Sequence, residues 1–259
     1  MTAPDQQPAD GGSVQVLRKS AAILDCFSAT NPRLRAAEIA AATGMPTSTV
    51  ARILRTLVTE NLLQRQGAVY SIGLRVTSWS AAANAGSDLI ATAGPLIALL
   101  RDRCGESCGI YVRQGASRVS VLQQESTKSI IYRGYVGQVM PLHAGAAGKV
   151  FMAYEPEALQ AALDEGLTGF TEHTVIDPHV LDKQLEVVRE NGWAFSEEER
   201  EPGLNSLAAP VYGPGNAVIA SVAVGGPSFR VTRSASEAMA ELVTECAAAI
   251  SRGLLGSGE

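Results

Sequence analysis

The sequence predicts two domains, a small and mainly helical one that ends in a β-hairpin, followed by a larger α+β domain. Before residue 62, apolar residues recur at helical spacing in three segments. Two short strand-like runs then meet at a Gln66-Gly67 turn, and from Gly109 onward β-branched runs alternate with helical segments. The 259 residues, 46% of them hydrophobic and 18% charged, suffice for two folded domains.

The first residues contrast with the rest of the chain. The segment MTAPDQQPADGG is rich in Pro, Gly, Gln and Asp and has little apolar surface, so residues 1–13 are expected to form a flexible tail rather than a signal peptide. The longest apolar run, residues 217–224, is far below the ~20 residues of a membrane helix. These features predict a cytoplasmic protein that does not contact a membrane.

Charge is distributed unevenly along the chain. Residues 14–75 contain eight basic and three acidic residues, a net charge of +5, whereas the whole chain carries −5. A basic segment in an acidic protein is typical of a surface that neutralises phosphates. The N-terminal domain is therefore a candidate for binding nucleic acid.

The N-terminal helices have recognisable boundaries. Apolar spacing predicts a first helix over about 16–29 and a second over 36–43, with Gly44 as its left-handed stop. Pro46 and the hydroxyl residues after it open a third helix that continues to about Asn61. Two helices joined by a short Gly-containing turn are typical of a helix-turn-helix, whose second helix enters the DNA major groove.

The third helix and the following hairpin supply the candidate DNA contacts. Strands at 62–65 and 68–72 would complete a winged helix. Short hydroxyl side chains suit base edges, and guanidinium groups suit bases and phosphates. The predicted base-reading residues are Thr47, Ser48, Thr49 and Arg52. The predicted backbone contacts are Arg55 and Arg65. A solvated basic face on a subdomain that binds nothing is the alternative.

Three blocks of sequence resemble the IclR-type (isocitrate-lyase regulator) transcription factors. They are TGMPTSTVARILRTLVTENLLQRQGAVYSIG, PLHAGAAGKVFMAY and GWAFSEEEREPGLNSLAAPVYGPGNAVIASVAVGGP, in the family's order and spacing. The resemblance covers about residues 14–255. One departure is Arg35-Ala36-Ala37 where the family usually has a capping Ser or Thr, which would cost about 1 kcal/mol of helix stability. The resemblance implies a winged helix-turn-helix (14–73), a linker helix (74–88) and a GAF-like effector-binding and oligomerisation domain (89–259).

The C-terminal domain is predicted to contain a mainly antiparallel sheet flanked by helices. Strands are expected at 109–113, 118–124, 130–135, 193–198, 206–212 and 218–224. Helices are expected at 88–103, 146–154, 156–164, 180–191 and 234–254.

Several motifs in this domain suggest catalysis at first sight. The stretch GESCG matches the G-x-S-x-G of serine hydrolases, but a helix precedes Ser107 and a strand follows it, the reverse of a nucleophile elbow. HAGAAGKV lacks the first glycine and the hydroxyl residue of a phosphate loop. The acidic run 197–201 is interpreted as a solvated face. No enzyme activity, cofactor or metal site is predicted, and the four cysteines are expected to be reduced thiols.

The small residues 145–148 could admit a ligand close to helix amides, or could simply pack a helix tightly on the sheet. The family resemblance favours the ligand. It implies effector contacts from the loop, the later strands and an apolar wall: Ala146, Ala147, Ser196, Ser206, Ala223, Gly225, Tyr132 and Met140. Because the strand positions are small, a roomy pocket poor in strong donors is expected, suited to an aromatic or acyl compound.

These observations predict a ligand-responsive regulator of transcription that binds a near-palindromic DNA operator as a homodimer or homotetramer. Two alternatives remain at this point. One is a cytosolic serine hydrolase that uses Ser107, and the other is a constitutive DNA-binding protein without an effector.

Overall fold

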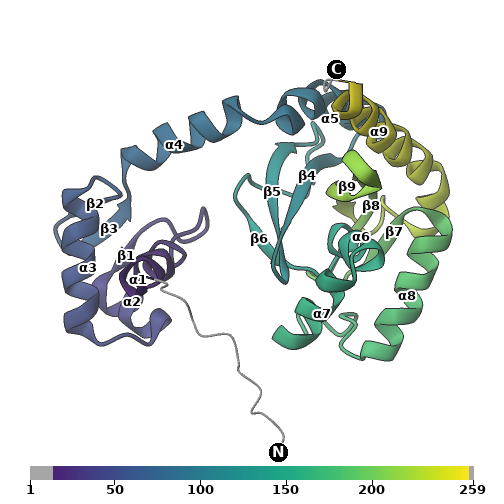
Figure 1. The fold of residues 1–259 in the computed structure, drawn as a ribbon. Helices are drawn as coiled ribbons and strands as arrows, with labels where there is room; N and C mark the ends of the chain where they lie inside the picture. The colour runs from purple at the N-terminus through teal and green to yellow at the C-terminus, as the bar shows by residue number, and fades with distance from the viewer. Residues whose placement is uncertain (1–13, 257–259) are drawn as a thin grey trace, which may run out of the picture. The chain divides into compact units, whose positions relative to one another are not determined.

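The computed structural model describes residues 14–256, so the predicted tail at 1–13 lies outside the described residues. The chain divides into two compact units between Gly86 and Ser87, within the segment predicted as a linker (Figure 1). Each unit has its own hydrophobic core.

The N-terminal unit is a helix-turn-helix with a small sheet. Its elements are α1 (Gln15–Leu24), β1 (Leu34–Arg35), α2 (Ala36–Thr43), α3 (Thr47–Thr59), β2 (Leu63–Gln66), β3 (Val69–Ile72) and α4 (Leu74–Ala85). The strands form an antiparallel sheet in the order β1-β3-β2. The side chains at the centre of the core are Ile23, Ile39, Val50, Leu54 and Leu63, all at most 1% exposed.

Three details of this unit differ from the sequence expectation. Helix α1 ends at Leu24 rather than near residue 29: the amides of Cys26 and Phe27 donate to carbonyls three residues earlier, and Ser28 accepts from the Asn31 amide in a local turn. Strand β1 was not predicted, since two residues carry no periodic signal. The missing cap of α2 is partly replaced by Glu38, whose carboxylate accepts a 2.6 Å bond from the Arg35 amide.

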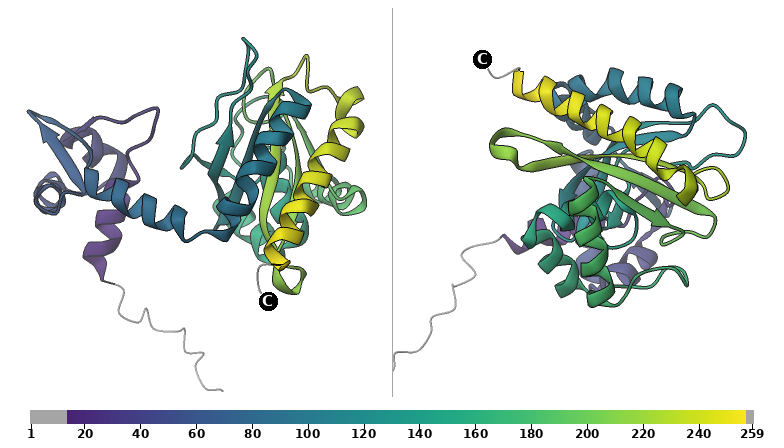
Figure 2. Two further views of the ribbon diagram at one scale, coloured as in Figure 1. Left: turned by 90° about the horizontal axis from the view of Figure 1, so that it is seen from above. Right: turned by 90° about the vertical axis from the view of Figure 1, so that its right-hand side faces the viewer.

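The C-terminal unit is built on a six-stranded antiparallel sheet in the order β6-β5-β4-β9-β8-β7. The strands are β4 (Ser107–Gln114), β5 (Ser117–Gln124), β6 (Val139–Pro141), β7 (Ala194–Glu197), β8 (Leu204–Tyr212) and β9 (Val218–Pro227). Helices α5 (Asp88–Cys104) and α9 (Ser236–Gly256) cover one face of the sheet (Figure 2). Helices α6 (Ala146–Tyr154), α7 (Pro156–Glu165) and α8 (Pro178–Asn191) lie on the other.

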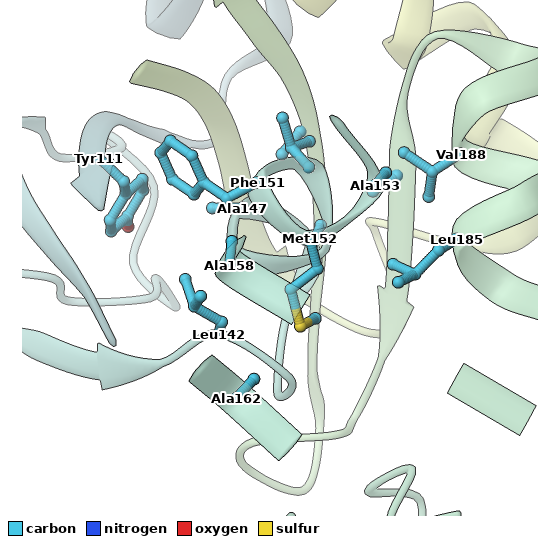
Figure 3. Packing of buried hydrophobic residues seen from close by; sticks show 14 of the residues in the cluster. Tyr111, Leu142, Ala147, Phe151, Met152, Ala153, Ala158, Ala162, Leu185 and Val188 are labelled. Carbon is cyan, nitrogen blue, oxygen red and sulfur yellow. The ribbon is translucent and has the colours of Figure 1, made fainter. Parts of the chain in front are cut away.

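The core beneath α6 positions the segment where a ligand was expected. Phe151 and Leu142 are fully buried there, in one cluster with Tyr111 of the sheet and Leu185 of α8 (Figure 3). Gly148 lets α6 approach its own preceding loop, because a Cβ at this position would lie 1.9 Å from the Leu142 carbonyl oxygen. Tight packing therefore explains Gly148.

The strand predicted at 130–135 does not form. The sheet edge next to β5 is instead completed by residues 137–141, where the Gly137 amide donates to Ser120 and Ser120 donates to Gln138. Gly137 has a φ of 88°, a conformation that favours glycine and that shapes the loop before the edge strand. Ile130, despite its β-branched side chain, is 61% exposed in this loop.

Candidate functional site

The outer face of α3 and the wing carry the predicted DNA contacts. The exposed members of the set are Thr47, Ser48, Arg52, Arg55 and Arg65, and Thr49 is half-buried. Ser48, Arg52 and Arg55 follow one another at helical spacing, opposite the buried stripe of Val50 and Leu54. The structure thus brings five of the six predicted side chains to the surface of one unit.

The wing arginine is held in place by its own hairpin. Arg65 Nε donates a 2.7 Å bond to the Gly67 carbonyl at the turn, and its guanidinium lies 5.7 Å from the Tyr70 ring centre. Arg65 is an exposed residue of β2. This arrangement can present a fixed positive charge to a phosphate.

The C-terminal unit contains a pocket on the α6 side of the sheet. It contains about 490 Å³ of atom-free space, a volume that includes space open to solvent. Its floor is a row of paired residues that crosses four strands: Ser196 faces Ser206, Ser206 faces Gly225, and Gly225 faces Ser107. The register of the sheet therefore gathers small residues that are far apart in the sequence.

The structure places six of the eight predicted effector contacts in the lining of this pocket. They are Tyr132, Ala147, Ser196, Ser206, Ala223 and Gly225. Ala146 is buried just behind the lining, and its amide donates to Ser206 Oγ at 3.2 Å. Met140 is buried beside the pocket, where its sulfur contacts Arg118 and Arg200.

The pocket is not poor in donors, as the sequence had suggested. Arg118 and Arg200 both line it, together with Gln123 and Tyr111. Burial lowers the pKa of Arg118 to about 10, so this side chain remains protonated at neutral pH. Burial raises the pKa of Tyr111 to about 12, which keeps its phenol neutral. The expectation of weak polar anchoring is therefore wrong.

These two arginines were missed for different reasons. Arg118 lies on β5, on the same face of the strand as the buried Ser120. The two-residue alternation along the strand was the signal that could have placed Arg118 inside. Arg200 was assigned with its acidic neighbours to a solvated face. That interpretation is wrong for Glu199, which is 4% exposed and forms an ion pair with Lys149, itself 1% exposed.

Glu199 connects this ion pair to the start of α6. Its Oε1 accepts from Lys149 Nζ, and its Oε2 accepts a 3.2 Å bond from the Gly145 amide. Gly145 has a φ of 112°, and a Cβ there would lie 2.7 Å from the Arg118 guanidinium. Gly145 is thus required both by its backbone conformation and by the approach of Arg118.

Ser107 has a structural role at the rim of the pocket. Its hydroxyl donates to the Tyr132 carbonyl at 2.7 Å and accepts from the Ser126 amide at 3.1 Å. It therefore fixes the loop that carries Tyr132, rather than merely leading into a strand. The order of α5 before it and β4 after it is the one expected from the sequence and is not that of a nucleophile elbow.

Within residues 14–256, no group of three or more His, Cys, Asp or Glu residues is placed to hold a metal ion. The four cysteines are free thiols. No single helix in the described part of the chain is long and apolar enough to cross a membrane, and only the bent pair α4 and α5 has that length and composition when taken together.

Comparison with known proteins decides the family. The profile of the bacterial transcriptional regulator IclR C-terminal domain matches residues 81–252, and that of the IclR helix-turn-helix domain matches residues 16–67. The chain belongs to the IclR family. The HTH-type transcriptional repressor AllR of Escherichia coli K12, an IclR-family relative, is 30% identical over 252 residues, which cover 96% of this chain and 93% of AllR.

Solved IclR-family structures share the fold over almost the whole chain. An IclR regulator from Alicyclobacillus acidocaldarius superposes with a TM-score of 0.83 at 24% identity, over 93% of this chain and 99% of that one. An IclR homologue from Microbacterium hydrocarbonoxydans, solved in complex with 4-hydroxybenzoate, superposes with a TM-score of 0.77 at 21% identity, over 92% of this chain and 98% of that one.

The IclR assignment confirms the fold class and the general function expected from the sequence. The protein is a DNA-binding regulator of transcription with an N-terminal helix-turn-helix and a C-terminal α+β effector-binding domain, and it is not an enzyme. The hydrolase alternative is thereby excluded.

Proposed function

We propose that this cytoplasmic regulator binds a near-palindromic operator as a homodimer or homotetramer, and that a small organic effector in the C-terminal pocket changes its affinity for that operator. The observation that carries the proposal is the pocket on the sheet of the C-terminal unit, in a chain that also exposes the predicted recognition helix. Effector and operator binding must then be reciprocally coupled. The relatives named AllR are repressors, which supports repression as the action of this chain.

The proposed effector is an aromatic or acyl compound of modest size. Tyr111 and Tyr132 provide aromatic surface, and Ala147 and Ala223 leave room beside them. The Microbacterium homologue was solved in complex with 4-hydroxybenzoate, an aromatic acid, which supports an effector of this class. A ligand panel scored by thermal unfolding tests this, because a compound at ~100 times its Kd stabilises by ~2.7 kcal/mol. Stabilisation by no compound would favour the constitutive alternative.

The proposed DNA contacts make a first prediction. In a duplex selected from random sequences by the wild-type protein, Arg52→Ala should weaken binding by about 1–3 kcal/mol, because a base contact is lost. Arg65→Ala should weaken binding to selected and unrelated duplexes alike, and should reduce the salt slope by about 0.9 for one phosphate contact. Fluorescence anisotropy across a salt series measures both effects.

The control for these variants is Arg252→Ala, which removes the same charge from an exposed site on α9 of the other unit. It should bind DNA as the wild type does. Unchanged affinity and salt slope in Arg52→Ala and Arg65→Ala would contradict the assigned recognition face. A selected duplex without two-fold symmetry would contradict the near-palindromic operator.

Helix α4 supports the proposed oligomer. None of its twelve residues is buried, and two of them are large apolar side chains: Leu74 is 75% exposed and Trp79 is 54% exposed. Large apolar side chains on a helix without a buried face are typical of a surface that packs against another copy. We expect Trp79→Glu to shift the protein to a smaller oligomer in light scattering after size exclusion. Thr77→Glu, an exposed position on the same helix, is the charge-matched comparison. An unchanged mass for Trp79→Glu would remove α4 from the interface.

A further inference from the structure

Arg200 presents an unused pair of hydrogen-bond donors at the pocket. Its Nε and Nη2, which share one edge of the guanidinium plane, are buried and have no hydrogen-bond partner within the described residues. Glu201 Oε1 lies 3.0 Å from Nη2 but is not aligned to accept a hydrogen bond, and the Glu201 side chain is 57% exposed. The opposite edge contacts the Met140 sulfur through Nη1. A free edge of this kind matches a planar carboxylate with two parallel hydrogen bonds.

A second buried cation lies beside Arg200. Arg118 is 4% exposed, and its Nη2 lies 3.9 Å from the same Met140 sulfur. It donates to the carbonyls of Pro141 and Ala144, while its Nε has no partner among residues 14–256. The two guanidinium groups thus converge on one neutral atom. Among the described residues no ion pair compensates Arg118, and Arg200 pairs with the largely exposed Glu201, so this arrangement favours an incoming anion.

The nearby acidic side chains are already engaged. Of the described residues that line the pocket, none is acidic. Glu199 is paired with Lys149 and with the Gly145 amide. Glu106 is paired with Lys128 and Arg230 at 2.9 and 2.6 Å. Neither carboxylate is free to neutralise the two guanidinium groups, and Glu201, which pairs with Arg200 at 3.0 Å, is 57% exposed.

At the start of α6, the other place where an anion could bind, two amides are already engaged. The Gly145 amide donates to Glu199, and the Ala146 amide donates to Ser206 Oγ. A carboxylate aimed at these amides would have to displace both bonds. Among the buried side-chain donors of the described residues, those without partners belong to the two arginines.

We propose that the pocket binds a carboxylate, and that Arg200 is the residue that selects it through its Nε and Nη2, with Arg118 adding a second positive charge. This inference deepens the proposed function and rests on it, since it assumes that the effector occupies this pocket. It assigns the anionic group to the arginine side of the pocket rather than to the helix amides.

The test compares carboxylates with neutral amides of the same shape. The probes are benzoate and benzamide, pyruvate and pyruvamide, and hexanoate and hexanamide, titrated into the full-length protein by calorimetry. For a pair that binds, the carboxylate should bind roughly 10- to 100-fold more tightly than the amide, because charged hydrogen bonds are made in place of neutral ones. Equal affinity of amide and carboxylate would overturn the proposal.

Variants of Arg200 separate selection from simple packing. Arg200→Gln should abolish the preference for the carboxylate, because it weakens carboxylate binding far more than amide binding. Arg200→Lys keeps the charge without the paired donors and should restore only part of the preference. The control, Arg252→Gln, removes an exposed arginine elsewhere in the same unit and should behave as the wild type. A carboxylate preference that survives Arg200→Gln would overturn the assignment.

Unliganded protein provides a measurement that needs no effector. Since Arg200 and Arg118 contact the same Met140 sulfur and the ion pair of Arg200 is with the exposed Glu201, Arg200→Gln should unfold at the same or a higher temperature than the wild type. If Arg200 only packs on Tyr132, whose ring centre is 4.8 Å away, the unfolding temperature should fall. A fall, combined with no binding of any of the six probes, would overturn the proposal, whereas a rise supports it.

Operator affinity distinguishes this inference from the proposed function. Carboxylate binding that depends on Arg200 but leaves DNA binding unchanged would support the anion site and contradict the regulatory role of the pocket. Amides that bind as tightly as carboxylates and alter DNA binding would contradict the anion site and support the regulatory role of the pocket.

Discussion

Glu199→Ala is expected to lower the free energy of unfolding of the C-terminal unit by about 3–5 kcal/mol, because it leaves the ammonium group of Lys149 buried without its counter-ion. The same change removes the acceptor of the Gly145 amide at the start of α6. Urea unfolding followed by circular dichroism would measure the loss.

Two comparisons identify the cause of that loss. Glu245→Ala breaks an exposed ion pair with Arg103, in which Glu245 is 61% exposed, and should cost less than about 1 kcal/mol. The double variant Lys149→Met with Glu199→Gln removes both charges and retains an acceptor for Gly145, so it should recover most of the stability. A double variant as unstable as Glu199→Ala would show that unpaired charge is not the reason.

Gly148→Ala is expected to destabilise the C-terminal unit by about 3 kcal/mol, at the upper end for overpacking in a core. The added methyl group would lie 1.9 Å from the Leu142 carbonyl oxygen. This oxygen belongs to the backbone, so it cannot relieve the clash by a change of rotamer as a side chain could. Alanine is better than glycine in a helix by about 1 kcal/mol, which is too little to offset the clash. Thermal or urea unfolding would record the change.

Gly94 provides the matched comparison, because it also lies within a helix and a Cβ there meets nothing within 4 Å. Gly94→Ala should stabilise the protein by about 0.5–1 kcal/mol. If the two substitutions had the same effect, the close approach of α6 to its preceding loop would not control stability. Ligand binding should weaken together with stability in Gly148→Ala, because the carbonyls of Pro141 and Ala144 in the same loop accept hydrogen bonds from Arg118.

Local patterns predicted the elements that have strong local signals. Helices α2 and α6 begin and end at the residues predicted from the spacing of apolar residues and from helix-ending residues. Gly44 ends α2 in the left-handed conformation, with a φ of 65°. Elements that depend on a distant partner were harder to predict. The edge of the sheet forms at 139–141 rather than at 130–135, because pairing with β5 decides it and local β-propensity does not.

The chemistry of the pocket was predicted less well than its location. Family resemblance pointed to the row of small residues that the strand register brings together, such as Ser196 and Ser206. It gave no indication that Arg200 turns inward from an acidic run while Glu197 and Glu201 remain more exposed. The side to which each residue of a short irregular segment points is set by its neighbours in space.

The sequence by itself determined the two-part organisation, the recognition helix with its basic outer face, and the kinship that identifies a regulator of transcription, because these depend on local periodicity, charge and motif order. Only the tertiary structure decided that Glu199 is buried against Lys149, that Ser107 fixes the Tyr132 loop, and that two arginines converge on one pocket. Those features arise from pairing between strands and helices far apart in the chain, where burial changes the energetic cost of each charge.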